Sequence, residues 1–313
     1  MSRKRKPLAT VPVQPLLAAV TEALDLLGRN GTTARPELPG PPLPSLLDQV
    51  HAMLAQAETT RLEPIRTIHQ FACTGGTVIS RCIAALPSVF LVSELDPLSR
   101  LGVNPQKPRF APSDLVLHLH YSIRAVDDED ILAVFLPALN GLLGLCDQRG
   151  QRLVLRDHAH SIYCAGDGIR DRPSLDQIVR RLRPVLSLVT VRHPMESYLS
   201  LLRNRWEHYT PRGIDAYSDR YLRFLDDHAH LPVMRYEDFV ADPAARLSDM
   251  AAILAIPFDA GAIDLFNVIP MTGDSGRKGN LIAPRPARPV PAELAAAAAE
   301  SASFARLCDR LGY

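Results

Sequence analysis

From about residue 66 onward, short apolar segments alternate with amphipathic ones, and this alternation limits the folds open to the chain. The candidate strands, rich in apolar and β-branched residues, are 67–72, 89–92, 152–155, 185–191 and 233–236. The candidate helices, with apolar residues at helical spacing, are 77–86, 128–147, 175–182, 194–205, 216–227, 243–255 and 292–311. Strands that alternate with helices pair in parallel, so the pattern predicts an α/β fold around a central parallel sheet.

The first sixty residues differ from the rest and are predicted to form a helical extension (1–60) ahead of one larger domain (61–313). Apolar side chains share a helical face in two stretches, about 16–27 and 45–59, and a proline-rich connector lies between them at 36–44. An amphipathic helix buries its apolar face against a neighbour. The extension is therefore expected to cover an edge of the main domain or to pair with a second copy in a homo-oligomer.

Composition and charge exclude several classes of protein. The chain has 35 Lys and Arg against 34 Asp and Glu, a balance that gives no reason to expect nucleic acid as a partner. The basic run at residues 3–6 is interpreted as a solvated terminus. Five scattered cysteines favour a reducing compartment over a disulfide framework, and no apolar run has the length of a membrane span. We therefore expect a cytoplasmic protein.

A glycine pair follows the first candidate strand, in the run Cys73-Thr74-Gly75-Gly76-Thr77. Two glycines let the backbone turn sharply, and the helix that follows presents free N–H groups and the positive end of its dipole. Such a nest fits a phosphate or a sulfate, although a Gly-Gly turn alone also serves as a plain strand-to-helix connection. The run is not G-x-x-x-x-G-K-[ST], which disfavours a magnesium-dependent P-loop kinase or ATPase.

Three later segments also carry groups suited to anions. Arg192 ends the fourth candidate strand, and Ser200 lies eight residues further on, beyond the helix start at Pro194. Tyr236 closes the last candidate strand ahead of two acids. A glycine-rich loop then offers two cations in Arg277-Lys278-Gly279, a common way to hold a terminal phosphate.

In this order along the chain, the four segments resemble the motifs of the PAPS-dependent sulfotransferase superfamily, which uses 3'-phosphoadenosine-5'-phosphosulfate (PAPS). The resemblance covers about residues 66 to 280 and implies a P-loop-like three-layer fold with PAPS as the co-substrate. It also implies the nucleotide-binding residues: Thr74, Gly75, Gly76 and Thr77 at the 5' end, Arg192, Ser200, Arg277, Lys278 and Gly279 at the 3'-phosphate, and Tyr236 in the nucleotide pocket.

The resemblance departs from the family at the phosphosulfate loop, which usually opens with a Lys or Arg where this chain has Thr74. Arg156 is the first candidate to supply the missing charge and Arg81 the second. Arg156 corresponds to the catalytic lysine of a family segment in which His158 corresponds to the base. Glu94 resembles the glutamate base of tyrosylprotein-type members. His158 is favoured because imidazole needs less tuning to accept a proton near neutral pH, and the other residue then orients the acceptor.

Two other functions stay open beside an active sulfotransferase. The missing loop cation is compatible with a protein that binds PAPS or its product PAP without transfer, and a kinase-like phosphotransferase is disfavoured by the absent Walker lysine. The acceptor is unidentified beyond a hydroxyl or amine, with a pocket expected from 96–112 and 163–172. H-x-H pairs at 118/120, 158/160 and 228/230 lack nearby cysteines and are interpreted as strand or surface histidines, so no metal is expected.

Overall fold

The computed structural model describes residues 13–30, 45–52, 62–104, 106–272 and 281–313. It divides into two compact units, residues 1–62 and residues 63–313. In the first unit, α1 spans Val13–Asn30 and residues 46–52 are also helical. The proline-rich connector, the basic run at 3–6 and the end of the predicted second helix lie outside the described residues.

A five-stranded parallel sheet forms the centre of the second unit, with the order β2-β3-β1-β5-β7. The strands are β1 (Ile65–Gln70), β2 (Val89–Leu95), β3 (Arg152–Asp157), β5 (Val185–Val191) and β7 (Val233–Arg235). All six residues of β1 are buried because it is the central strand, with β3 on one side and β5 on the other. The predicted parallel sheet is confirmed, and the strand ends differ by up to three residues.

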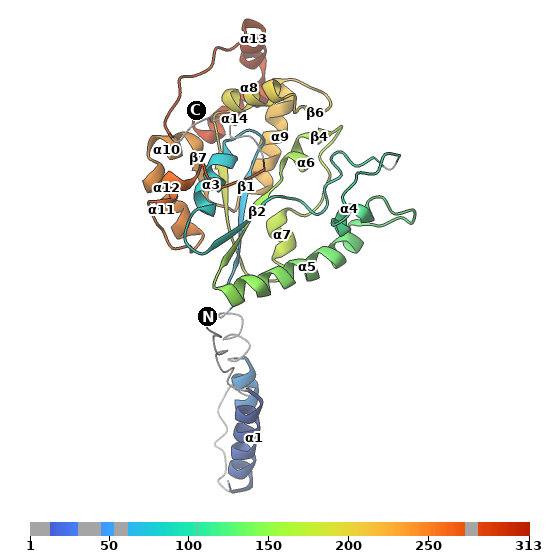
Figure 1. The fold of residues 1–313 in the computed structure, drawn as a ribbon, viewed down its shortest axis with the longest axis vertical. Coiled ribbons are helices and arrows are strands. Elements are labelled where there is room, and N and C mark those ends of the chain that lie inside the picture. The colour runs from blue at the N-terminus through green and yellow to red at the C-terminus, as the bar shows by residue number, and fades with distance from the viewer. Residues whose placement is uncertain (1–12, 31–44, 53–61, 105, 273–280) are drawn as a thin grey trace, which may run out of the picture. The chain divides into compact units, whose positions relative to one another are not determined.

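Helices cover both faces of the sheet, which gives three layers (Figure 1). One face carries α3 (Gly76–Ala84), α10 (Tyr236–Ala241), α11 (Pro243–Ile253) and α12 (Ala262–Leu265). The other face carries α5 (Asp128–Arg149), α6 (His160–Tyr163), α7 (Leu175–Val179), α8 (Pro194–Asn204), α9 (Ile214–Asp227) and α14 (Ala302–Leu311). Because side chains alternate along a strand, Ile65 packs toward α5 and α7 whereas Ile68 packs toward α3. The P-loop-like three-layer arrangement is thereby confirmed.

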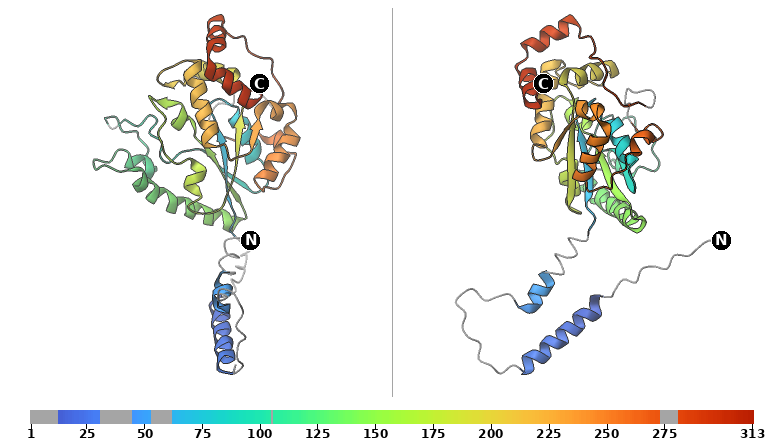
Figure 2. Two further views of the ribbon diagram at one scale, coloured as in Figure 1. Left: turned by 180° about the vertical axis from the view of Figure 1, so that it is seen from behind. Right: turned by 90° about the vertical axis from the view of Figure 1, so that its left-hand side faces the viewer.

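Smaller elements complete the second unit. These are α4 (Leu115–Leu119), α13 (Ala292–Glu300) and a two-stranded pair of β4 (Ala165–Gly166) with β6 (His208–Tyr209). The single helix predicted over 292–311 is wrong, because the chain breaks at Ser301 into α13 and α14 (Figure 2). Ser301 has extended backbone angles, and its hydroxyl accepts a hydrogen bond from the Phe304 N–H at 3.0 Å, which begins a new helix.

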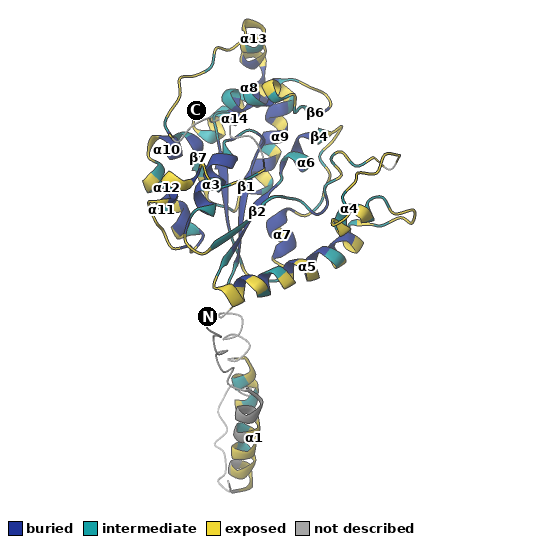
Figure 3. Cartoon of the chain, viewed as in Figure 1, coloured by how far each residue is buried: buried dark blue, intermediate teal, exposed yellow. Residues whose placement is uncertain are grey.

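Helix α5 has the length and composition of a membrane-crossing helix, and it is the one described helix that does. Its apolar side chains are not all free for lipid. A stripe that includes Ile131, Phe135 and Leu139 is buried in the core of the second unit, while the opposite side of the helix is exposed (Figure 3). A core helix passes the same test, and this stripe is the pattern of one.

The strand order places a crevice at the carboxyl end of β1. From β1 the chain crosses to β2 at one edge of the sheet, whereas from β5 it crosses to β7 at the other edge. The connections after β1 and β5 therefore diverge although the two strands are neighbours. Open parallel sheets bind ligands at such a point of divergence.

Candidate functional site

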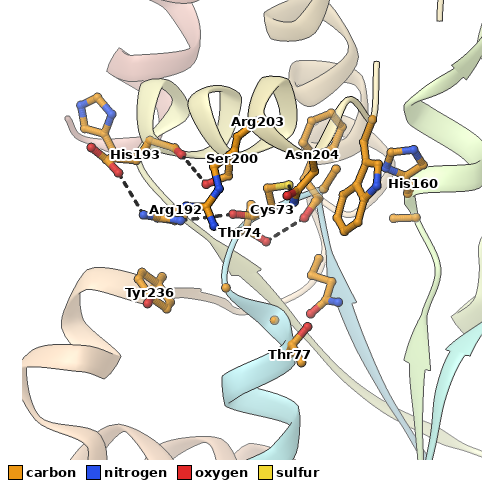
Figure 4. A pocket seen from close by; sticks show the side chains of 18 of the residues that line it. Cys73, Thr74, Thr77, His160, Arg192, His193, Ser200, Arg203, Asn204 and Tyr236 are labelled. Carbon is orange, nitrogen blue, oxygen red and sulfur yellow. Dashed lines mark hydrogen bonds and ion pairs between the residues drawn. The ribbon is translucent and has the colours of Figure 1, made fainter. Parts of the chain in front are cut away.

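A cavity of about 1050 Å³ opens at the carboxyl ends of β1, β3 and β5. Its walls come from the loop between β1 and α3, the ends of β3 and β5, helices α8 and α10, and residues 284–288 (Figure 4). Among the described residues that line it are six arginines and four carboxylates. The local excess of positive charge, in a chain close to neutral overall, favours an anionic ligand.

The loop between β1 and α3 turns through two residues with positive φ, Cys73 at 65° and Gly75 at 84°. A side chain at Gly75 would lie 2.2 Å from the Tyr236 ring, and one at Gly76 would lie 1.2 Å from Gln70 Oε1. Glycine is therefore required at Gly75, where φ is also left-handed, whereas a side chain at Gly76 would require the Gln70 side chain to move. The turn leads straight into the first N–H groups of α3, which begins at Gly76.

Thr74 and Thr77 have different roles in this loop. The Thr74 side chain is buried, and its hydroxyl donates to the Phe71 carbonyl at 2.8 Å, so it stabilises the turn. Thr77 lies on the first turn of α3 and its hydroxyl accepts from Arg156 Nη2 at 3.1 Å. A cationic side chain from β3 thus reaches the start of the loop helix, beside the position where the sequence lacks a loop cation.

Arg192 and Ser200 both line the cavity at α8 and are linked through Glu196. Arg192 Nη2 donates to Glu196 Oε2 at 3.0 Å, and the Ser200 hydroxyl donates to the Glu196 carbonyl at 3.0 Å. Figure 4 shows both side chains on the α8 side of the cavity, facing the loop that carries Thr74. The helix that starts at Pro194 brings the two residues to one wall despite their separation in sequence.

Arg288 joins this wall, and the sequence motifs did not indicate it. Its Nη1 donates to the Ser200 hydroxyl at 2.8 Å and its backbone N–H donates to Glu196 Oε1 at 2.9 Å. Arg277, Lys278 and Gly279, which the resemblance assigns to this end of the ligand, lie outside the described residues. Arg288 stands in a proline-rich stretch without a recognisable pattern, so no local signal distinguishes it from its neighbour Arg285.

Tyr236 lies across the cavity from α8, as the first residue of α10. The predicted strand end at 236 is wrong by one residue, because β7 stops at Arg235 and the helix begins at once. The Tyr236 ring covers Gly75, and the Arg192 guanidinium lies 4.9 Å from the ring centre, a cation–π contact. Tyr236 therefore connects the β1–α3 loop with Arg192, the residue that follows β5.

At the other end of the cavity, Arg156, Glu94 and His158 form one connected group. Arg156 Nη1 pairs with Glu94 Oε1 at 2.7 Å, and Glu94 Oε2 lies 3.6 Å from His158 Nε2. Burial lowers the pKa of Arg156, and the Glu94 carboxylate opposes that shift, so the guanidinium keeps its charge. Arg81, the other candidate cation, is not among the residues that line the cavity.

Glu94 reaches this position through a distorted strand. Its φ is 59°, and the pairing of β2 with β3 shifts register between Val92 and Leu95. A bulge of this kind re-aims a side chain, here into the cavity. Positive φ in a residue other than glycine is a strained conformation that clusters at functional sites.

A group of histidines near Arg156 and Glu94 also lines the cavity, and of these only His158 is a site residue expected from the sequence. The His160 ring lies 6.0 Å from that of His158, and its Nε2 lies 3.1 Å from His208 Nδ1. Burial lowers the pKa of His160 to about 3, so this ring is neutral. Trp206 packs edge-on against His160 with 6.0 Å between ring centres.

Comparison with known proteins gives several similar solved structures, two of which are sulfotransferase structures. No family model and no curated protein matches the sequence. The crystal structure of a sulfotransferase from Alicyclobacillus acidocaldarius shares 19% identity, covers 79% of this chain and 94% of its own, and has a TM-score of 0.42. The mouse sulfotransferase SULT7A1 complexed with PAP shares 12% identity, covers 69% of this chain and 68% of its own, and has a TM-score of 0.37. Both of these similar structures are sulfotransferases.

Proposed function

We propose that the chain is a sulfotransferase that moves the sulfuryl group of PAPS to a hydroxyl or amine acceptor and releases PAP. The observation that carries the proposal is the composition of one cavity. The lining of this cavity includes a glycine turn at a helix N-terminus, the two arginines Arg192 and Arg288, and the group of Arg156, Glu94 and His158. Two anion sites, one of them beside a cation and a base, fit a nucleotide that is charged at both ends.

The 5'-phosphosulfate would bind at the β1–α3 loop and the 3'-phosphate at α8. Free N–H groups at the start of α3 suit the first anion. Arg192, Arg288 and the Ser200 hydroxyl suit the second, because a dianion is best held by charge-assisted hydrogen bonds. The resemblance adds Arg277 to Gly279 to this second set, and Tyr236 lies between the two sites.

Arg156 would supply the charge that the loop itself lacks. As the sulfuryl group departs, negative charge builds on the 5'-phosphate oxygen, and a cation placed there in advance stabilises it. Arg156 is 4% exposed and contacts Thr77 at the first turn of α3. Its fixed position supports this role, because sulfuryl transfer depends on alignment and charge more than on covalent help from the protein.

His158 would be the base and Glu94 its positioning residue. Glu94 is ion-paired with Arg156, so protonation of the Glu94 carboxylate would break that ion pair. With His158 Nε2–H directed at Glu94, the neutral ring keeps a lone pair on Nδ1. That nitrogen takes the acceptor's proton as the acceptor atom bonds to sulfur. The bond from sulfur to the 5'-phosphate oxygen breaks, and PAP leaves with the electron pair.

Calorimetry with PAP and an acceptor screen with radiolabelled PAPS test the proposal. Saturable PAP binding together with transfer, or with slow hydrolysis of PAPS, is the expected result. Binding without transfer or hydrolysis across the panel would favour a nucleotide-binding protein. That alternative is motivated by Thr74, which stands where the loop of the family usually has a Lys or Arg. Absence of PAP binding would overturn both, and transfer of phosphate from ATP that requires magnesium would revive the kinase-like alternative.

A further inference from the structure

A cluster of buried ionisable side chains lies outside the cavity, on the face of the sheet covered by α7 and α9. His69 comes from β1, Asp176 from α7 and His228 from the residue that follows α9. Each is at most 1% exposed, and one nitrogen or oxygen of each lies within 4.8 Å of those of the others. Burying three such groups together is costly unless they bind a partner.

His69 is oriented as a metal-binding histidine is. Its Nδ1–H donates to Asp157 Oδ2 at 2.9 Å, which leaves Nε2 with the lone pair in the neutral ring. That Nε2 lies 3.8 Å from Asp176 Oδ1. A carboxylate behind the distal nitrogen fixes the tautomer and raises the basicity of the ligating one.

His228 has the same arrangement with a different second partner. Its Nδ1–H donates to the Phe224 carbonyl at 2.8 Å, so the lone pair is on Nε2. Among the described residues this buried Nε2 has no hydrogen-bond partner. The His228 ring centre lies 4.5 Å from that of His69. A buried acceptor without a donor indicates a missing partner.

Asp176 supplies the oxygen. Ser174 donates to Oδ1 at 2.5 Å, whereas Oδ2 has no hydrogen-bond donor among the described residues and only two longer ion-pair neighbours. These are Arg180 Nη2 at 3.5 Å and His230 Nε2 at 3.4 Å. His230 is half exposed, so it gives the cluster a route to solvent, and its Nε2 is a further nitrogen beside Asp176.

We propose that His69, Asp176 and His228 form a zinc site, which the half-exposed His230, beside Asp176, completes as the fourth ligand. Three imidazole nitrogens and one carboxylate oxygen are a donor set that Zn²⁺ accepts in tetrahedral geometry. Four protein ligands leave no open position, so the ion is structural. It ties β1, α7 and the end of α9 together directly before Gln70, where β1 enters the cavity loop. The H-x-H pair at 228 and 230 thereby has a role that its spacing alone did not indicate.

The alternative is a metal-free hydrogen-bond network. Thr67 Oγ1 lies 2.9 Å from His69 Nε2 and 2.6 Å from Ser187 Oγ, so the hydroxyl can donate to that nitrogen. This network gives His69 Nε2 a hydrogen-bond donor, but it provides no donor to His228 Nε2 or Asp176 Oδ2. The two arrangements differ in what they bind, which makes them separable without any activity assay.

The test uses the untagged full chain, stripped with a chelator and titrated with ZnCl₂ and, separately, with CoCl₂. The expected result is one tightly bound zinc per chain by elemental analysis and an intense visible cobalt spectrum of the tetrahedral type. Asp176→Asn and the half-exposed His230→Ala should each weaken zinc binding at least about tenfold. His118→Ala removes an exposed histidine from another H-x-H pair and is the matched control, expected to bind zinc as the parent does.

The cobalt spectrum and the zinc stoichiometry need only the parent protein, so a variant that fails to fold does not remove the test. A parent that binds no stoichiometric zinc, or a pale octahedral cobalt spectrum, overturns the site in favour of the hydrogen-bond network. Zinc retained equally by folded Asp176→Asn and His230→Ala also overturns it, because the ion is then held elsewhere. Each result is independent of whether the chain binds PAP.

Discussion

At the scale of single residues, Glu94 is where backbone strain and the proposed chemistry meet. Its φ of 59° is a strained backbone conformation that persists only where the surrounding structure stabilises it. The bulge in β2 does so here. The result is a carboxylate shared between Arg156 and His158. On this geometry rests our proposal that His158 is the base and Glu94 its positioning residue.

His158→Ala should lower kcat by about 10²–10⁴, the usual contribution of a general base, and leave PAP affinity nearly unchanged. Glu94→Gln should be milder, because it disturbs the orientation of His158 rather than removing the proton acceptor. Steady-state kinetics with an acceptor found in the screen measure both. If Glu94→Gln abolishes turnover and His158→Ala only raises the acceptor KM, the roles are reversed.

Arg192→Ala should weaken PAP binding by about one to two orders of magnitude. A charge-assisted bond to phosphate contributes about 1.5–3 kcal/mol, which corresponds to that range in Kd. Calorimetry is the measurement. Arg246→Ala is the control, because this exposed arginine of α11 pairs with Asp249 and does not line the cavity. Parent-like PAP affinity in the Arg192 variant would disprove the assignment.

Acid should destabilise the fold in part through His160. Burial lowers its folded pKa to about 3, while the unfolded ring titrates near 6.5. Between these values the unfolded state binds a proton that the folded state does not, so the free energy of unfolding falls as pH falls below about 6.5. The slope from this group is at most about 1.4 kcal/mol per pH unit.

His160→Gln isolates this contribution, since the amide keeps a donor toward His208 and carries no charge in acid. Urea unfolding at about pH 7 and about pH 5 should show a smaller loss of stability for the variant than for the parent. Equal losses would mean that the His160 ring is already charged, or solvated, in the folded protein.

At the scale of elements, the β1–α3 connection depends on glycine geometry more than on side chains. Gly75 has a left-handed φ of 84° and lies under the Tyr236 ring, so the turn is tight for two independent reasons. A loop with this much constraint presents the first N–H groups of α3 in a fixed direction. A preordered loop favours the binding of a small anion, because the loop loses little conformational entropy when the anion binds.

Gly75→Ala should lower the free energy of unfolding by about 1–2 kcal/mol from backbone strain alone, and PAP affinity should fall with it. Displacement of Tyr236 adds to this loss, since the new Cβ would lie 2.2 Å from the ring. Gly144→Ala in α5 is the matched control. No atom lies within 4 Å of its Cβ position, and alanine is the better helix former there. Urea unfolding and PAP calorimetry compare the two, and equal behaviour would contradict the predicted constraint.

The strands and long helices were predictable because their apolar periodicity extends over several residues. The segment 185–191 matches β5 at both ends. The strands β4 and β6 were not predictable, because each has only two residues and therefore no periodicity to detect. In the site, Thr74 to Thr77, Arg192, Ser200 and Tyr236 follow recognisable patterns. Arg288 and His208 reach the cavity only through long-range packing, which no local pattern encodes.

At the scale of the whole molecule, the second unit has an extensive core of its own. The three clusters of buried side chains contain only residues from Ile65 to Leu307. They surround the sheet on both faces, and the cavity is lined by residues 70 to 313.

The fragment 63–313 should therefore fold alone, with a thermal midpoint within a few degrees of the full chain and the same PAP affinity. Scanning calorimetry and PAP titration on both proteins make the comparison. Sedimentation of the two adds a second readout, because loss of a dimer in the fragment would assign subunit pairing to the extension. A fragment that is insoluble or lacks a cooperative transition would show that the extension supports the fold.

The position of Glu196 has a consequence for how quickly the proposed nucleotide would be recognised. The carboxylate accepts a hydrogen bond from Arg192 Nη2 at 3.0 Å and lies 3.8 Å from Arg288 Nε, so it offsets the mutual repulsion of the two guanidinium groups. An arriving phosphate has only to exchange one counter-ion for another. The rate of such an encounter would be set by diffusion and long-range electrostatic attraction, because the binding side chains need no rearrangement to come together.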